Sequence, residues 1–134
     1  MRYAILADIH SNLEALEAVL GDLSDKKVDR YVCAGDIVGY GADPKACLAR
    51  IRELCETSVA GNHDWAVART LSMEFFNAYA REAIEWTWTQ LSDDDVEWLR
   101  DRPLQADVGE SAMIVHSTVH DPDAFDYLLT SYDA

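Results

Sequence analysis

Residues 3–10 read YAILADIH, a short apolar run that stops at two metal-type side chains, Asp8 and His10. The same pattern returns in residues 31–36 (YVCAGD) and in residues 57–64 (TSVAGNHD). Short runs rich in β-branched and aromatic residues are typical of buried strands, although the third run is weaker than the others. The stretches between the runs have helical spacing. The alternation of strand and helix predicts right-handed crossovers and a parallel sheet, which is an α/β fold.

The three predicted strands should end at one edge of the sheet, because parallel strands joined by helices all run the same way. Open α/β sheets bind ligands at this edge. Side chains two apart on an extended chain, such as Asp8 and His10, point to the same side and can share one ion. We therefore expect one site, formed by Asp8, His10, Asp36, Asn62 and His63.

The other elements are predicted from helical spacing, caps and turns. Residues 11–14 (SNLE) form a capping-box pattern, so Ser11 is expected to cap the first helix. A hairpin is expected before His116, another ligand-type residue at a strand end. Trp86, Trp88 and Trp98 are expected to pack beside the sheet; a base-stacking platform is disfavoured because no basic residues are interleaved among the rings. The predicted helices are 12–24, one opening at 43–44, 75–91 and one from 92 to 102, and the hairpin strands are 104–108 and 112–115.

Length and composition favour one folded domain. The chain has 134 residues, of which 49% are hydrophobic, so residues 1–134 are assigned to a single domain. A net charge of -14 opposes a polyanionic partner, so broad nucleic-acid binding is not expected. No early apolar run suits a signal peptide or a spanning helix, so a cytoplasmic protein without a membrane partner is expected. The three cysteines lack the close pairs of zinc sites and are interpreted as free thiols.

Carboxylate, amide and imidazole ligands without thiolate suit Mn²⁺, Fe, Mg²⁺, Co²⁺ or Zn²⁺. Asp36 lies on the middle strand in sequence order and is the natural bridge between two ions, which together would clamp phosphoryl oxygens. Asp64 follows His63 and is expected to hold its imidazole charged, as a general acid requires. Each residue alone has a plainer interpretation, because an Asp or His at a strand end is usually a cap and Gly61-Asn62 is a common turn pair.

The ordered motifs Asp8-x-His10, Gly35-Asp36 and residues 61–64 (GNHD), with His116 after them, resemble the calcineurin-like metallophosphoesterase family. Residues 35–44 (GDIVGYGADP) resemble its small prokaryotic phosphodiesterase branch. The resemblance runs from residue 1 to about residue 122. It implies a four-layer α/β/β/α sandwich and an enzyme that hydrolyses a phosphodiester or phosphomonoester by attack of a hydroxide bridging two metals.

The resemblance also assigns roles to particular residues. It implies that Asp8, His10 and Asp36 hold one metal and that Asp36, Asn62 and His116 hold the other. His63 would protonate the leaving group, with Asp64 behind it, so these two form the catalytic pair. Two divalent ions are implied, manganese first, with Fe, Zn, Co, Ni and Mg also compatible. The expected partner is a small phosphate-ester substrate.

Three departures from the family pattern bear on activity. Ser11 and Ser117 replace usual glycines, which predicts a narrower site with no ligand lost. The family's later Gly-His-x-His segment is not found, and His120 is in a different context, so each metal is expected to have three protein ligands. We therefore expect the N-terminal and central part of the usual domain, truncated at its C-terminus, with an exposed sheet edge that favours a homo-oligomer. The alternative is a catalytically impaired fragment that acts as a metal-binding or interaction module.

Overall fold

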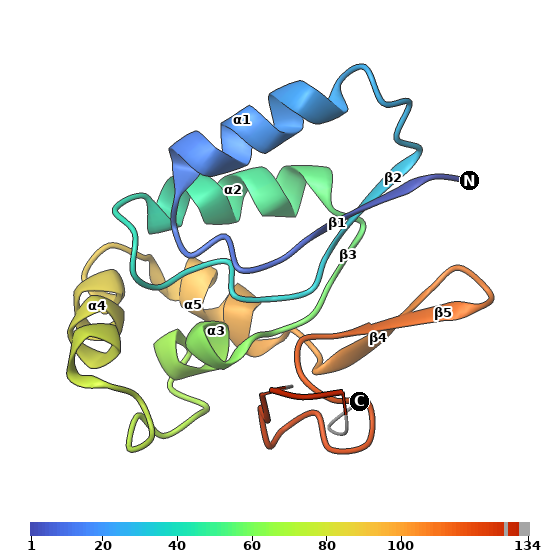
Figure 1. Cartoon of the computed structure of the whole chain (residues 1–134). Helices are drawn as coiled ribbons and strands as arrows, with labels where there is room; N and C mark the ends of the chain where they lie inside the picture. The colour runs from blue at the N-terminus through green and yellow to red at the C-terminus, as the bar shows by residue number, and fades with distance from the viewer. Residues whose placement is uncertain (128, 132–134) are drawn as a thin grey trace.

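A three-stranded parallel sheet forms the centre of the computed structural model, which describes residues 1–127 and 129–131 (Figure 1). Its strands are β1 (Tyr3–Leu6), β2 (Arg30–Cys33) and β3 (Thr57–Ser58), in the order β1-β2-β3. This confirms the predicted α/β topology. The third strand has only two residues, as its weak apolar pattern suggested. Residues 128 and 132–134 of the predicted domain lie outside the described part.

Two helices cover one face of this sheet, α1 (Leu13–Leu23) and α2 (Pro44–Leu54) (Figure 1). Leu16, Leu48 and Ile51 from these helices lie in the larger core, together with residues of β1 and β2. Pro44 occupies the first turn of α2, where its missing N–H removes no helical hydrogen bond. These side chains explain why the two crossover segments fold back onto the sheet as helices.

The cap of α1 differs from the prediction. Asn12, not Ser11, is the N-cap, and its side-chain oxygen accepts the backbone N–H of Ala15 at 3.0 Å. Ser11 is fully buried in a left-handed conformation, with φ of 58°, and its hydroxyl has no hydrogen-bond partner. The two residues are adjacent in the capping pattern, and the tight turn after β1 moves the helix start along by one position.

The opposite face of the sheet packs against an antiparallel hairpin, β4 (Gln105–Val108) and β5 (Ala112–Val115). Val32 and Val59 from the parallel sheet form a second, smaller core with Val108 and Ile114 from the hairpin. The hairpin strands match the sequence prediction closely. Helix pair, parallel sheet and hairpin are thus three successive layers of the expected sandwich.

The remaining helices are α3 (Asn62–Val67), α4 (Ala78–Trp88) and α5 (Asp93–Arg100), and they pack together at one end of the sheet (Figure 1). The sequence predicts no helix at α3, where Asn62 and His63 are expected as site residues after the third strand. It also began α4 three residues early, since Asn77 caps that helix by accepting the N–H of Ala80. Ser92 caps α5 as predicted, in a capping box with Asp95.

The tryptophans lie in this helical region. Trp88 donates its indole N–H to the carbonyl of Val67 at 2.9 Å, and Trp98 stacks beneath the guanidinium of Arg102. Trp86 faces an open groove that Tyr40 also lines. None of the helices in the described residues has the length and apolar run needed to cross a bilayer.

Candidate metal centre

The loops that follow the three parallel strands place their polar side chains around Asp36. Its Oδ2 lies 3.6 Å from Nε2 of His10 and 3.5 Å from Nε2 of His116. Asp8 approaches the same cluster, with its Oδ1 3.8 Å from Nε2 of His10. The structure therefore brings together side chains from the first strand end and from the hairpin, which are separated by more than a hundred residues in sequence.

The two outer imidazoles are held in the orientation that metal-binding histidines adopt. Nδ1 of His10 lies 3.2 Å from the carbonyl oxygen of Val38, and Nδ1 of His116 lies 2.9 Å from that of Ala34. A carbonyl only accepts, so each Nδ1 donates to it, and each Nε2, which faces Asp36, is the nitrogen left for a metal. The two Nε2 atoms and the carboxylate oxygens thus face one another, and such a set of atoms is one that a divalent cation can bind.

Two groups of potential ligand atoms share Asp36. One contains His10, Asp36 and His63, and the other contains Asp8, Asp36 and His116, with the ligand atoms of each group within 4.8 Å of one another. Asn62 adds an amide oxygen 3.2 Å from Nε2 of His116. A carboxylate shared by two groups is the arrangement expected of a bridge between two ions. The residues present therefore fit two hard or borderline cations.

Asp36 is almost completely buried, with 3% of its surface exposed. Its Oδ1 accepts the backbone N–H of His63 at 2.9 Å, which leaves Oδ2 for the two imidazoles. Burial raises the pKa of Asp36 above the ordinary value of an aspartate, and the charge of Asp8 adds to this effect. A bound cation would remove this penalty by neutralising the carboxylate.

Asp64 does not hold the imidazole of His63, which corrects the expectation from their adjacency. Its carboxylate turns away and accepts three backbone N–H groups, from Ile37 at 2.9 Å, Val38 at 3.1 Å and Gly61 at 3.1 Å. Adjacent residues on a helix point to different sides, and α3 begins here. Asp64 therefore ties the loop after β2 to the start of α3, and its pKa is raised by burial and by Asp36.

No described carboxylate lies within ion-pair distance of the imidazole of His63. Burial, together with the nearby His10 and His116, lowers the pKa of its imidazole to about 4. Its Nδ1 is buried without a hydrogen-bond partner. An anionic oxygen placed beside this ring would raise its pKa and give it a proton to deliver. A buried imidazole nitrogen without a hydrogen-bond partner fits a residue that contacts substrate or metal.

Aromatic rings that the sequence interpretation did not include surround the histidines. The ring of Tyr40 lies 4.6 Å from that of His63, and Phe76 lies 5.0 Å from it on another side. Phe125 lies 6.2 Å from the ring of His116. The family-like Gly39-Tyr40-Gly41 stretch could have indicated Tyr40 as a site residue. The irregular sequence near Phe125 has no pattern that indicates a role for that residue.

Glycines provide the space for two of the central side chains. A Cβ on Gly61 would collide with Oδ1 of Asp36, and one on Gly39 would lie 2.5 Å from Nδ1 of His63. Gly39 also has a φ of 97°, a conformation that L side chains rarely adopt. The glycines of these motifs are therefore required by the packing of the ligands.

Two further predictions concern residues at the edge of the ligand cluster, His120 and Ser117. His120 is exposed and belongs to neither ligand group among the described residues. Ser117 lies next to His116, and its hydroxyl donates to the carbonyl of Asp126 at 3.3 Å. Neither Ser11 nor Ser117 displaces a predicted ligand from the cluster.

Comparisons with known proteins agree with this geometry. The calcineurin-like phosphoesterase family model matches residues 1–132. Uncharacterized protein MJ0912 of Methanocaldococcus jannaschii is 39% identical over 132 residues, which cover 96% of this chain and 54% of that protein. The chain therefore spans about half the length of this curated relative.

Solved structures give the same result. A metallophosphoesterase from Sphaerobacter thermophilus matches with a TM-score of 0.68 and 44% identity, over 81% of this chain and 44% of that one. A second structure, provisionally described as a diadenosine tetraphosphatase, matches with a TM-score of 0.70 and 25% identity, over 89% of this chain and 51% of that one. With its fold, its ligand cluster and the family model matched over almost its whole length, the chain belongs to the calcineurin-like phosphoesterase family.

Proposed function

We propose that this protein hydrolyses a phosphate ester, a phosphodiester or a phosphomonoester, with the help of two divalent cations, Mn²⁺ first among them. One observation carries the proposal: Oδ2 of Asp36 lies within 3.6 Å of the Nε2 atoms of both His10 and His116. Both imidazoles have their other nitrogen committed to a backbone carbonyl. Family membership supports a phosphoesterase that uses divalent metals.

Each residue of the cluster has a proposed task. Asp36 would be shared by the two ions. The family resemblance assigns Asp8 and His10 to one ion and Asn62 and His116 to the other, whereas the distances group Asp8 with His116 and His10 with His63. When bound, the cations supply positive charge for the phosphoryl oxygens and lower the pKa of the attacking water. The chain itself orients the ester and excludes bulk water, and His63 delivers a proton to the departing oxygen.

Asp64 is proposed as a positioning residue. It accepts the N–H of Val38, and the carbonyl of the same residue accepts from Nδ1 of His10. The orientation of that imidazole therefore depends on a backbone segment that Asp64 holds. A partner of this kind typically changes metal affinity or activity by about 10 to 100-fold when it is lost.

The proposed substrate is small. The net charge of -14 opposes long polyanions, and the likeness to a provisionally described diadenosine tetraphosphatase supports a compact phosphate compound. We place the reaction in the cytoplasm. The three free thiols, Cys33, Cys47 and Cys55, support this compartment because disulfides are rare there.

The test is hydrolysis of bis(p-nitrophenyl) phosphate and p-nitrophenyl phosphate with and without added Mn²⁺. The unsubstituted protein should be active only with metal, and Asp36→Ala and His63→Ala should lower kcat/KM by about 100-fold or more. His120→Ala is the matched control, because this exposed histidine lies outside both ligand groups. It should keep the original rate.

Metal content distinguishes the alternative function. About two Mn²⁺ ions per chain are expected at saturation, and Asp36→Ala should lose at least one of them. Equal background rates in all variants, with metal still bound by the unsubstituted protein, would favour a metal-binding or interaction module. Failure to bind any metal would overturn the proposed centre itself.

A further inference from the structure

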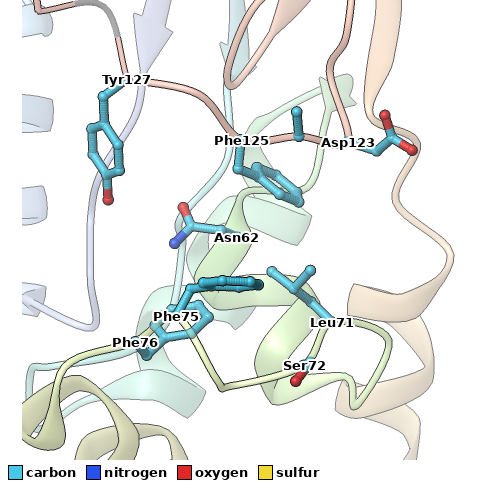
Figure 2. A pocket seen from close by; sticks show the side chains of 9 residues that line it. Asn62, Leu71, Ser72, Phe75, Phe76, Asp123, Phe125 and Tyr127 are labelled. Atoms are coloured by element: carbon cyan, nitrogen blue, oxygen red, sulfur yellow. The ribbon is translucent and has the colours of Figure 1, made fainter.

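A cavity of about 360 Å³ opens beside the ligand cluster (Figure 2). Asn62 is the ligand-type residue in its wall, and in Figure 2 its amide lies between Phe125 on one side and Phe75 on the other. The wall is otherwise mostly apolar. Its further residues are Leu71, Ser72, Phe76, Asp123, Ala124 and Tyr127.

This cavity borders the candidate ligand cluster. A smaller cavity of about 190 Å³ is lined by Asp8 and His116, both proposed ligands, and it shares three wall residues with the larger one. The shared residues are Asn62, Phe125 and Tyr127. A phosphorus atom held at the ligands would therefore have an organic substituent within reach of the larger cavity.

Two aromatic side chains in this wall are unusually exposed to solvent. Phe75 is 94% exposed, and Tyr127 is also exposed, although large apolar side chains are normally covered. Aromatic faces of this kind bind planar groups by stacking. Phe76 forms the cavity floor toward the catalytic side, because its ring also contacts that of His63 at 5.0 Å.

The charge of the wall restricts what can enter. Among the described residues that line the two cavities, none is lysine or arginine, whereas Asp8, Asp123 and Asp126 are present. A second phosphate or another anionic substituent would be repelled there. An uncharged aromatic substituent meets no such penalty and buries apolar surface.

We propose that the larger cavity receives an uncharged aromatic group of the ester whose phosphorus lies at the ligand cluster. This inference rests on the proposed phosphoesterase function and specifies its substrate class. The aromatic group would contact the rings of Phe75 and Phe125 and the amide of Asn62 that lies between them. The second groove near the cluster, lined by Tyr40, Tyr79 and Trp86, is the competing location.

The test uses two non-hydrolysable monoanions, diphenylphosphinate and dimethylphosphinate, titrated calorimetrically into Mn²⁺-saturated protein. Both present the same two phosphoryl oxygens, and only the first carries aromatic groups. The diphenyl compound should bind about tenfold more tightly. Phe75→Ala and Tyr127→Ala should each reduce this preference to about threefold or less. Both side chains are largely exposed, so these variants should fold normally.

Tyr79→Ala is the matched control, because Tyr79 is similarly exposed, at 82%, but lines the other groove. It should leave the preference unchanged. A preference lost in Tyr79→Ala instead of Phe75→Ala would overturn the assignment of the cavity. Equal affinity for the two compounds would overturn the aromatic specificity while leaving the phosphoryl site intact. Binding of neither compound would overturn both the site and this inference.

Discussion

At the scale of single residues, three candidate ligands have a backbone conformation that residues other than glycine usually avoid. Asp8, His10 and Asp36 all have left-handed backbone angles, with φ of 52°, 47° and 52°. Such conformations cost about 1 to 3 kcal/mol each and persist where the surrounding structure enforces them. Their concentration at one sheet edge means that backbone geometry fixes the positions of these candidate ligands.

Ser11 shares this conformation without an evident role in binding. Ser11→Gly is expected to raise the free energy of unfolding by about 1 kcal/mol, because glycine accepts a positive φ and the buried, unpartnered hydroxyl is removed. Urea denaturation of the chelator-treated protein measures the change. Ser11→Ala separates the two causes, since it removes only the hydroxyl. A lower free energy of unfolding in Ser11→Gly would show that the hydroxyl has a stabilising partner.

The space at Gly61 is needed by Asp36. Gly61→Ala is expected to weaken Mn²⁺ binding by about tenfold or more, because the added Cβ would displace Oδ1 of the carboxylate. Calorimetric titration with Mn²⁺ measures the affinity. Gly21→Ala is the control: nothing lies within 4 Å of the Cβ it would add. It should leave metal affinity unchanged and stabilise α1 by about 0.5 to 1 kcal/mol. Unchanged affinity in Gly61→Ala would contradict the close packing described.

At the scale of elements, Asp64 connects the loop after β2 with the start of α3. Asp64→Asn is expected to lower the free energy of unfolding by about 1 to 3 kcal/mol, because its NH₂ group cannot accept the N–H of Gly61. It should also lower kcat by about tenfold or more, through the displaced imidazole of His10. Thermal unfolding and Mn²⁺-dependent hydrolysis measure the two effects. Asp95→Asn, in the capping box of α5, is the comparison and should leave hydrolysis unchanged, because Asp95 belongs to neither ligand group.

Strand β1 lies at an edge of the parallel sheet, and its Ile5 is 65% exposed. An unpaired edge with an exposed apolar side chain favours pairing with another chain. We expect a dimer that Ile5→Lys converts to monomer, as measured by light scattering coupled to size-exclusion chromatography. Val19→Lys, on the exposed face of α1, should leave the dimer intact. A monomer at all concentrations of the unsubstituted protein would show that this edge is not used.

Much of the fold follows from local patterns in the sequence. The runs ending at Asp8 and Asp36 predicted strands and a shared edge, because period and topology alone place them there. The helix at Asn62 could not be predicted, because a glycine before a polar residue usually indicates a turn. Here tertiary contacts decide: the carboxylate of Asp64 accepts the N–H of Gly61 and two N–H groups of the loop after β2, which stabilises the start of the helix. The walls of the site could not be predicted: Phe76 and Phe125 reach the histidines only through folding of the chain around them.

At the scale of the whole molecule, burial of carboxylates lowers the free energy of unfolding of the metal-free protein at neutral pH. The pKa values of Asp36 and Asp64 are raised in the folded state, so folding binds protons that the unfolded chain has released. Stability from this source is complete below the ordinary aspartate value of about 4 and is lost as pH rises toward neutral. The net charge of -14 adds repulsion in the same direction.

Chelator-treated protein should therefore lose stability between about pH 4 and pH 7, and Mn²⁺ should restore it. Asp36→Asn should show a shallower loss over the same range, because its amide does not titrate. Melting temperatures recorded across this range, with EDTA and with excess Mn²⁺, test the prediction. A melting temperature that rises with pH in EDTA, or that Mn²⁺ leaves unchanged at neutral pH, would contradict it.

The contact between His116 and the carbonyl of Ala34 joins residues 82 apart, whereas His10, Asp36 and His63 all lie within the first 63 residues. The two ligand groups therefore close at different times during synthesis, since the N-terminal part of a chain is available first. In the proposed centre, Asp8, His10 and Asp36, which would hold the first ion, come together once β1 and β2 have paired. Asn62 and His116 would complete the second set only after the hairpin has folded, and an ion bound there would link the hairpin to the sheet.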